Sequence, residues 1–515
     1  MLIAEYLLRN ARNWPNRLAY VSETRRLTWG DVADRSLRLA HALRRLGVGP
    51  GDVIASMAED THETVETWYA AALIGAVRTG VNVRYAPAEM AHVLADAGAR
   101  VLIVEGGARE SDLERLDASL PGLHHVIGFG RHRQALDYEA LLASTPPLPE
   151  PAAVDPDACA AISYTTGSTG RPKGVRWSHR GIVATQVNTW LQAGMQHDDV
   201  FLHCLPAAGV PILLATWNVV NGAAVVLHRR FDAGRALAQL AEERVTSVLW
   251  VPTMMSDVLA HPRFAEYDLG RLRLVMYGSM PATPALVRRA LEGFGCRLQQ
   301  WYGSTEATAG WTSILHHEDH LAALDGRPEL LTSCGRSTLH CAMAVLDEAG
   351  DPVTDGTVGE ICVRGETLML GYHNLPDETA AVLRGDGWLR MGDLGFRDAE
   401  GYFYLVDRKN FMIITGGYNV YPMVVENALA EHPAVAEVAV VGAPDERWGE
   451  VVCAVVVARA PVTGAELVEF CRPRVASFEV PKRIDFVDRL PRGATGKVQK
   501  RELLERYRHV EQLQM

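Results

Sequence analysis

The sequence predicts an α/β protein with a large N-terminal domain made of α/β subdomains and a small α+β C-terminal domain. Amphipathic helices followed by short apolar strands recur over about the first 400 residues, a pattern typical of parallel sheets. After Asp407-Arg408 the pattern changes to a helix, two strands around a turn and another helix. The length of 515 residues allows about three domains at roughly 150 residues each, or fewer if one is large.

The helix–strand units can be followed in order along the chain. An amphipathic helix in 31–58 ends at a Gly-Pro-Gly turn before the apolar strand "VIASM". The same order of helix and strand recurs in 88–106, 234–252 and 283–303. Segments 363–374 and 401–410, with glycine and aromatic punctuation, predict smaller β units. Segments 424–460 and 464–475 supply the C-terminal helices and strands, so we predict domains over 1–407 and 408–515.

Composition limits the class of protein and its compartment. The formal net charge of −11 argues against a nucleic-acid partner, which a basic face would bind. The eight cysteines form no C-x-x-C pair, so we expect reduced thiols in a cytoplasmic protein. The N-terminus "MLIAEYLLRNARNWPNR" resembles an amphipathic helix and not a signal peptide.

Two further segments need a choice between alternatives. Residues 204–227 carry no charge and are long enough to cross a bilayer. Pro206, Pro211 and Gly222 would break a lipid-facing helix, so we expect a buried core and no membrane span. The histidines of "LHHEDH" (315–320) have the spacing of metal ligands, but we expect a solvated turn there.

The segment "SYTTGSTGRPKG" (163–174) has the composition of a phosphate-binding loop. Apolar residues before it predict a buried strand, and its glycines let backbone N–H groups approach an anion. Lys173 adds a mobile cation. Pro172 before the lysine and Gly174 after it disfavour the loop of P-loop NTPases, which continues directly into a helix. A flexible Ser/Thr/Gly surface loop is the alternative.

Five motifs in order resemble those of adenylate-forming enzymes, the superfamily of acyl-CoA synthetases, 4-coumarate-CoA-ligase-like enzymes, amino-acid adenylation domains and luciferases. They are "YTTGSTGRPKGV" (164–175), "QWYGSTEA" (300–307), "GWLRMGDLGFRDAEGYFYLVDRK" (387–409), "ITGGYNVYP" (414–422) and "LPRGATGKVQKREL" (490–503). The resemblance covers nearly the whole chain. It implies an AMP-binding N-terminal domain and a C-terminal domain that acts as a mobile lid.

The resemblance also implies roles for individual residues. The catalytic residues would be Lys497, Thr305 and Glu306, with Glu306 helping to hold Mg²⁺. The residues implied to bind ATP or AMP are Thr165, Thr166, Ser168, Thr169, Lys173, Gly278, Ser279, Tyr302, Asp393 and Arg408. Tyr302 would pack on adenine, whereas Asp393 and Arg408 would hold the ribose. We expect Gly209, Gly303 and Thr308 at the acyl pocket and Gly416, Gly417 and Tyr418 at the acceptor tunnel.

The implied reaction is an ATP-dependent, AMP-forming ligation of a carboxylic acid to CoA through an acyl-adenylate, in a monomer or homodimer. The sequence departs from the family pattern at two positions. Gly209 stands about where relatives have a histidine, which leaves more room for the acid and favours a hydrophobic one. Glu479 stands where relatives often have lysine, which disfavours CoA phosphates. An amine or a carrier-protein thiol therefore stays open as the acceptor.

Overall fold

The computed structural model describes residues 1–107, 120, 122–133, 136–165, 172–279, 282–308, 311–408, 411–415, 418–445, 447–493 and 498–512. The side chains of 407–408, 419 and 508–512 lie outside this description. The described residues form two compact units. Unit 1 contains 1–165, 172–343 and 363–389, and unit 2 contains 344–362 and the described residues from 390 onward. The domain boundary predicted near residue 408 stays a prediction.

The first sheet of unit 1 has parallel strands at its centre and antiparallel strands at both ends. Its order is β16-β15-β14-β13-β12-β10-β11-β1-β2. The pairings β15–β14 and β1–β2 are antiparallel, and those from β14 to β1 are parallel. The strands are β1 (Leu18–Val21), β2 (Arg26–Thr28), β10 (Val200–His203), β11 (Ala224–Leu227), β12 (Ser247–Trp250), β13 (Leu274–Gly278), β14 (Arg297–Gly303), β15 (Trp311–Leu315) and β16 (Ser333–Ser337).

The second sheet of unit 1 has the order β19-β9-β8-β4-β3-β5-β6-β7. Its pairings are parallel from β8 to β7, whereas β8–β9 and β9–β19 are antiparallel. The strands are β3 (Val53–Met57), β4 (Val77–Gly80), β5 (Ala99–Glu105), β6 (His125–Phe129), β7 (Leu136–Asp137), β8 (Cys159–Thr165), β9 (Lys173–Ser178) and β19 (Gly371–Tyr372).

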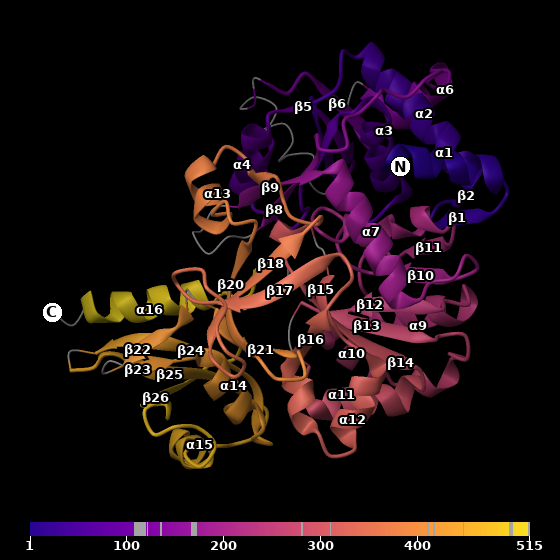
Figure 1. The fold of residues 1–515 in the computed structure, drawn as a ribbon. Coiled ribbons are helices and arrows are strands. Elements are labelled where there is room, and N and C mark those ends of the chain that lie inside the picture. The colour runs from indigo at the N-terminus through magenta and orange to yellow at the C-terminus, as the bar shows by residue number, and fades with distance from the viewer. Residues whose placement is uncertain are drawn as a thin grey trace. The chain divides into compact units, whose positions relative to one another are not determined.

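Helices connect these strands, and the four helix–strand units predicted from sequence are confirmed. α11, for example, begins after Thr283, whose side chain accepts from the Leu286 N–H, and ends at Gly295 with φ +60°, the left-handed position that glycine favours. The helices of unit 1 are α1 (Ile3–Asn13), α2 (Trp29–Arg45), α3 (His62–Ile74), α4 (Pro87–Ala97), α6 (Tyr138–Ser144), α7 (His179–Ala193), α8 (Ile212–Ala215), α9 (Ala233–Glu242), α10 (Pro252–Leu259), α11 (Pro284–Phe294), α12 (His317–Leu324) and α13 (Pro376–Val382) (Figure 1). Short 3₁₀ turns are η1 (Trp217–Val220), η2 (Phe264–Glu266), η3 (Thr305–Ala307) and η4 (Pro328–Thr332).

The uncharged stretch 204–227 is divided among α8, η1 and β11, whose residues are buried. In the part of the chain that is described, no helix has the length and apolar character needed to cross a membrane. The solvated turn expected at 315–320 is wrong. His317 begins α12, and His320 is buried, with its ring bonded to the Tyr277 hydroxyl and the His316 carbonyl.

Unit 2 confirms the α+β pattern predicted for the C-terminal segment. The chain enters it within β17 (Cys341–Leu346), leaves it within β18 (Gly359–Gly365) and returns in β20 (Leu389–Arg397) and β21 (Phe403–Arg408). A sheet that lies wholly in unit 2 has the order β23-β22-β25-β24, with β26 paired to β25. Its elements are β22 (Ile413–Thr415), β23 (Tyr418–Val420), β24 (Val435–Asp445), β25 (Gly449–Ala458), β26 (Arg483–Phe486), α14 (Pro422–Ala430), α15 (Gly464–Cys471) and α16 (Lys500–Gln512).

Alternating side chains build a core on each face of this sheet of unit 2. Val440 and Val452 pack with α14 and α15, whereas Val441 and Cys453 pack with Leu503 of α16. Successive residues of a strand point to opposite faces, so two apolar strands can serve both cores. α15 and α16 accordingly lie on opposite sides of the sheet (Figure 1).

Candidate active site

Strands β8 and β9 flank the predicted phosphate loop, and their two faces carry different side chains. Thr165 pairs in register with Lys173, and Ile162 pairs with Arg176. Because strand side chains alternate, Thr165 and Lys173 lie on one face, whereas Ile162 and Arg176 lie on the other. β19 extends the ribbon, since Tyr372 pairs with Val175 and thus shares the face of Lys173. We call this the lysine face.

A polar cluster on the lysine face joins the first two motifs. The Lys173 ammonium lies 5.4 Å from the centre of the Tyr372 ring. The Tyr372 hydroxyl donates a hydrogen bond to Glu306 Oε1, 3.0 Å away. Lys173 also forms an ion pair with Glu378 of α13. The fold therefore brings Lys173 and Glu306 to the same tyrosine side chain, although 132 residues separate them in sequence.

Backbone contacts fix the turn that carries Thr305 and Glu306. Trp177 of β9 donates from its indole N–H to the Thr305 carbonyl at 2.8 Å. The Met369 N–H donates to the Glu306 carbonyl, also at 2.8 Å. The η3 turn is thus held from both sides by the segments that place Lys173 and Tyr372. Both side chains of the turn are half-buried, so the carboxylate remains reachable.

The predicted adenine-binding residues follow two neighbouring strands at their carboxyl ends. Gly278 pairs in register with Trp301, and a Cβ at Gly278 would lie 2.3 Å from the Trp301 carbonyl oxygen. The close approach of β13 and β14 therefore requires glycine at this position. Ser279 follows with φ +68° and is exposed, whereas Tyr302 is half-buried at the end of β14.

Buried charged groups hold the segment of the predicted acyl pocket. Asp60 accepts a hydrogen bond from the Ala207 N–H at 2.7 Å. Arg78, which is 3% exposed, donates to the Ala207 carbonyl at 3.0 Å and to the Ala208 carbonyl at 3.3 Å. Gly80 packs directly under Ala208, because a Cβ on Gly80 would lie 2.0 Å from the Ala208 oxygen. These contacts place the backbone immediately before Gly209.

Burial shifts the pKa values of both Asp60 and Arg78. Burial lowers the pKa of Arg78 to about 9, and the Asp60 carboxylate acts in the opposite direction. Burial also raises the pKa of Asp60 well above its usual range. Gly209 itself has open space beside it, since the nearest atom to an added Cβ would be Ser163 Oγ at 3.9 Å. Gly209 and Ser163 therefore leave room in this region.

The other two residues predicted at the acyl pocket lie near η3. Gly303 ends β14 and is exposed. Thr308 has φ +53° and is fully buried, and its carbonyl accepts from the Thr185 hydroxyl of α7 at 3.1 Å. Their assignment to the acyl pocket stays a prediction.

Unit 2 carries the predicted ribose and acceptor residues. Asp393 of β20 is buried and pairs in register with Arg408 of β21. Tyr418 is 58% exposed, and its ring stacks on Phe478 with centres 4.8 Å apart and planes 15° apart. Glu479, next to Phe478, accepts from the Ala476 N–H at 2.8 Å. Its carboxylate therefore closes a local turn.

Several predicted site residues lie outside the described residues. They are Thr166, Ser168, Thr169, Gly416, Gly417 and Lys497, and for Arg408 only the backbone is described. Their roles stay predictions.

Comparison with known proteins decides the family. The family described as AMP-binding enzyme matches residues 7–373, and the AMP-binding enzyme C-terminal domain matches residues 424–497. The chain belongs to the AMP-binding enzyme family. The resemblance to adenylate-forming enzymes read from the motifs is thereby confirmed.

Relatives in the AMP-binding family match over nearly their whole length. A feruloyl-CoA synthase of Amycolatopsis sp is 37% identical over 509 residues, which cover 98% of this chain and 99% of that protein. An indoleacetate–CoA ligase of Aromatoleum aromaticum is 36% identical over 526 residues, covering 99% of this chain and 100% of that protein. The structure of the amide bond synthetase McbA from Marinactinospora thermotolerans superimposes with a TM-score of 0.88 at 31% identity, covering 98% and 100% of the two chains.

Sequence reasoning missed several residues that arrange this candidate site. Tyr372 lies in the segment 363–374, where we noted only glycine and aromatic punctuation, and the aromatic was the available signal. Glu378 and Trp177 contact motif residues across long sequence separations. Arg78 and Asp60 carried no signal at all, since an isolated charged residue in a sequence usually lies at the surface.

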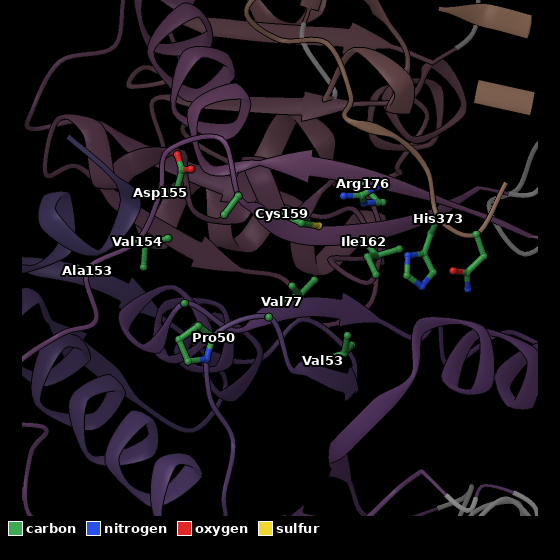
Figure 2. Close-up of a pocket in the computed structure, with 14 residues that line it drawn as sticks. Pro50, Val53, Val77, Ala153, Val154, Asp155, Cys159, Ile162, Arg176 and His373 are labelled. Carbon is green, nitrogen blue, oxygen red and sulfur yellow. The ribbon is translucent and has the colours of Figure 1, made fainter. Parts of the chain in front are cut away.

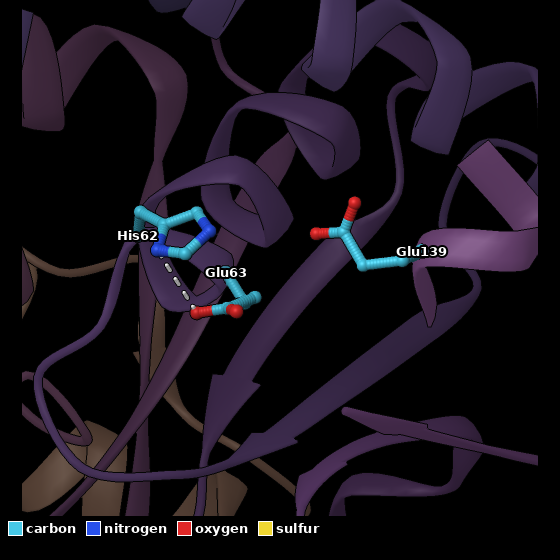
Figure 3. A group of neighbouring side chains, drawn as sticks. All are labelled: His62, Glu63 and Glu139. Atoms are coloured by element: carbon cyan, nitrogen blue, oxygen red, sulfur yellow. Dashed lines mark ion pairs between the residues drawn. The ribbon is translucent and has the colours of Figure 1, made fainter. Parts of the chain in front are cut away.

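A separate cluster in unit 1 has the composition of a metal site but is already neutralised. His62, Glu63 and Glu139 offer ligand atoms that lie within 4.8 Å of one another (Figure 3), and they are the one such group found among the described residues. Arg35 and Arg25 approach the Glu139 carboxylate to 2.7 Å and 3.1 Å. Two guanidinium groups on this carboxylate oppose a cation there, so we assign no metal to the cluster.

Proposed function

We propose that the protein activates a carboxylic acid with ATP and passes the acyl group to CoA. The observation that carries this proposal is the polar cluster in which Tyr372 contacts both Lys173 and Glu306. A mobile ammonium and a half-buried carboxylate, held together beside a glycine-rich loop, suit a nucleotide polyphosphate with its cation. The coenzyme A ligases among the relatives support the choice of reaction.

In the first step the carboxylate oxygen of the acid attacks the α-phosphorus of ATP. The bond from the α-phosphorus to the bridging oxygen breaks, and pyrophosphate leaves with the electron pair. Lys173 and the hydroxyl groups of the loop would bind the departing pyrophosphate, and Thr305 and Lys497 would stabilise charge on the α-phosphate. Gly278, Ser279 and Tyr302 would hold the adenine, while Asp393 and Arg408 would hold the ribose.

Mg²⁺ fits the donor atoms of this site. The Glu306 carboxylate supplies hard oxygen ligands, and the Tyr372 hydroxyl occupies one of them while orienting the group. When bound, the ion would neutralise phosphate charge.

In the second step the CoA thiol attacks the acyl carbonyl. The bond from the carbonyl carbon to the AMP oxygen breaks, AMP leaves, and the thiol proton is lost to solvent. Gly416, Gly417 and Tyr418 would line the path of the acceptor. The 58% exposed Tyr418 ring, stacked on Phe478, supports this path because it offers a flat apolar surface.

An amine is the second candidate acceptor. The similarity to the amide bond synthetase McbA favours it, and so does Glu479, a carboxylate beside Phe478 that would repel CoA phosphates. An amine would attack the same carbonyl and yield an amide with release of AMP. A carrier-protein thiol is the third candidate. The open space beside Gly209 leaves room for the acid in each case, and we propose a hydrophobic acid.

We place the reaction in the cytoplasm of the cell, in a monomer or homodimer. The eight cysteines are free thiols, which supports a reducing compartment. Size-exclusion chromatography with light scattering tests the oligomeric state.

Pyrophosphate release over a panel of hydrophobic acids tests the proposal, followed by mass spectrometry with CoA or amines as acceptor. We expect acid-dependent pyrophosphate release and a product that contains the acyl group joined to the acceptor. Lys497→Ala should lose pyrophosphate release but still consume a supplied acyl-adenylate. Wild-type pyrophosphate release by this variant would refute the role of Lys497. Failure to consume the adenylate would refute the separation into two steps.

A further inference from the structure

A second pocket lies at the opposite end of the strands from the predicted ATP site. It has a volume of about 440 Å³ and is lined by 14 residues of unit 1 (Figure 2). Val53, Val77 and Cys159, which are the first residues of β3, β4 and β8, contribute to its wall. The phosphate loop follows the carboxyl end of β8, where ligands of parallel α/β sheets bind. The pocket is therefore separate from the nucleotide site.

The lining of this pocket is mostly apolar, with a cation at one end. Pro50, Val53, Val77, Val154 and Ile162 supply the apolar wall. Arg176 and His373 lie together at one end of the pocket, and Pro50 and Val154 lie toward the other (Figure 2). A concave apolar surface with a few polar groups is the usual form of a small-molecule site, and the volume falls within the range of roughly 300–1,000 Å³.

Arg176 is the group in this pocket that selects a ligand. It is half-buried, and among the described residues no carboxylate forms an ion pair with it. Its guanidinium lies beside the Cys159 thiol, whose pKa is raised by burial and lowered in turn by Arg176. His373 already uses Nε2 on the Asp96 carbonyl at 3.0 Å. Asp155 also lines the pocket, but it lies toward the Val154 end, away from Arg176 (Figure 2). A guanidinium in a partly buried, mostly apolar pocket with no carboxylate paired to it favours an anion, and its planar donors match a carboxylate.

We propose that this pocket is a second small-molecule site that binds an organic carboxylate with an apolar body. The carboxylate contacts Arg176, and the apolar body lies along Val53, Val77 and Pro50. The site shares a ribbon with the predicted ATP site. Arg176 and His373 lie on the reverse of the lysine face, and His373 directly follows Tyr372, which holds Glu306. The two sites therefore lie on opposite faces of the same strands.

Alkylation of Cys159 by N-ethylmaleimide reports on this pocket alone, because the thiol lines it. Hexanoate and its uncharged analogue hexanamide are the probes, and peptide mass spectrometry measures the rate. Cys296, also a partly buried thiol of unit 1, is the internal reference. The assay requires neither ATP nor turnover, so its failure would leave the proposed ligase activity untouched.

Hexanoate should slow the alkylation of Cys159 but not of Cys296, by about tenfold at ten times its dissociation constant. Hexanamide should have little effect. Arg176→Met should weaken the protection by hexanoate about tenfold or more, and Arg176→Lys should retain part of it. Arg180→Met is the matched control, because Arg180 pairs with Asp157 and does not line the pocket. Each variant is compared with itself, with and without hexanoate.

Three results would overturn the proposal. The first is equal protection by hexanamide and hexanoate, which needs no variant and would exclude recognition of the charge. The second is undiminished protection in Arg176→Met. The third is an absence of protection at saturating hexanoate, which would mean that the pocket does not admit a ligand.

Discussion

Removal of one hydroxyl group tests the arrangement of the catalytic carboxylate. In Tyr372→Phe the ring that faces Lys173 remains, but Glu306 loses a hydrogen bond of 3.0 Å. A hydrogen bond to a charged group contributes about 1.5–3 kcal/mol when well shielded. Because Glu306 is only half-buried, we expect a loss of about 1–2 kcal/mol in transition-state stabilisation, or roughly a 5- to 30-fold decrease in kcat/KM for ATP.

Acid-dependent exchange of pyrophosphate into ATP, measured at several Mg²⁺ concentrations, is the assay for this variant. Tyr138→Phe is the matched control, since Tyr138 also donates to a glutamate, Glu66, at 2.6 Å but away from the site. The control should lower stability and leave the exchange kinetics unchanged. Tyr372→Leu should be worse than Tyr372→Phe, because it also removes the ring from Lys173. Exchange by Tyr372→Phe within twofold of wild type, or an equal loss in Tyr138→Phe, would refute the role of this hydroxyl.

Three further substitutions test other features. Arg78→Met should raise the KM for the acid about tenfold and leave the KM for ATP unchanged, because Arg78 holds the carbonyls before Gly209. Arg78→Lys should restore part of the affinity for the acid. An equal rise in both KM values in the exchange assay would contradict this role. Glu378→Gln should release Lys173 from its ion pair and lower the KM for ATP by a factor of about two to five. An unchanged KM for ATP would show that Glu378 does not compete with ATP for Lys173. Burial raises the pKa of Glu63 from 4.5 to about 7 in the folded protein. The protonated carboxyl therefore contributes its full stabilisation below pH 4.5, and this contribution is lost as the pH rises to about 7. Glu63→Gln should therefore match wild type in denaturant unfolding near pH 4.5 and exceed it by up to about 3 kcal/mol near pH 8, and equal differences at both pH values would contradict the shift.

The regular parts of the fold could be predicted because their signals are local. The Gly-Pro-Gly turn between a helix and "VIASM" predicted α2 and β3. Alternation of helix and strand is enough to predict parallel sheets. The error at residues 315–320 has the same origin. We expected a solvated turn there, but His320 is buried through contacts with Tyr277, which is 43 residues away in sequence and gives no local signal.

The sequence by itself determined the family, the nucleotide chemistry and the set of motif residues, because glycine-rich loops and charged motif residues keep their order along the chain. Only the tertiary structure decided which residues share a face. Tyr372 and His373 are neighbours in sequence, yet one contacts Lys173 and Glu306 and the other lines the second pocket. The tertiary structure likewise showed that Arg78 and Asp60 both bind the backbone of Ala207. Strand alternation and pairing between distant segments assign side chains to faces, and that assignment depends on partners which no local pattern names.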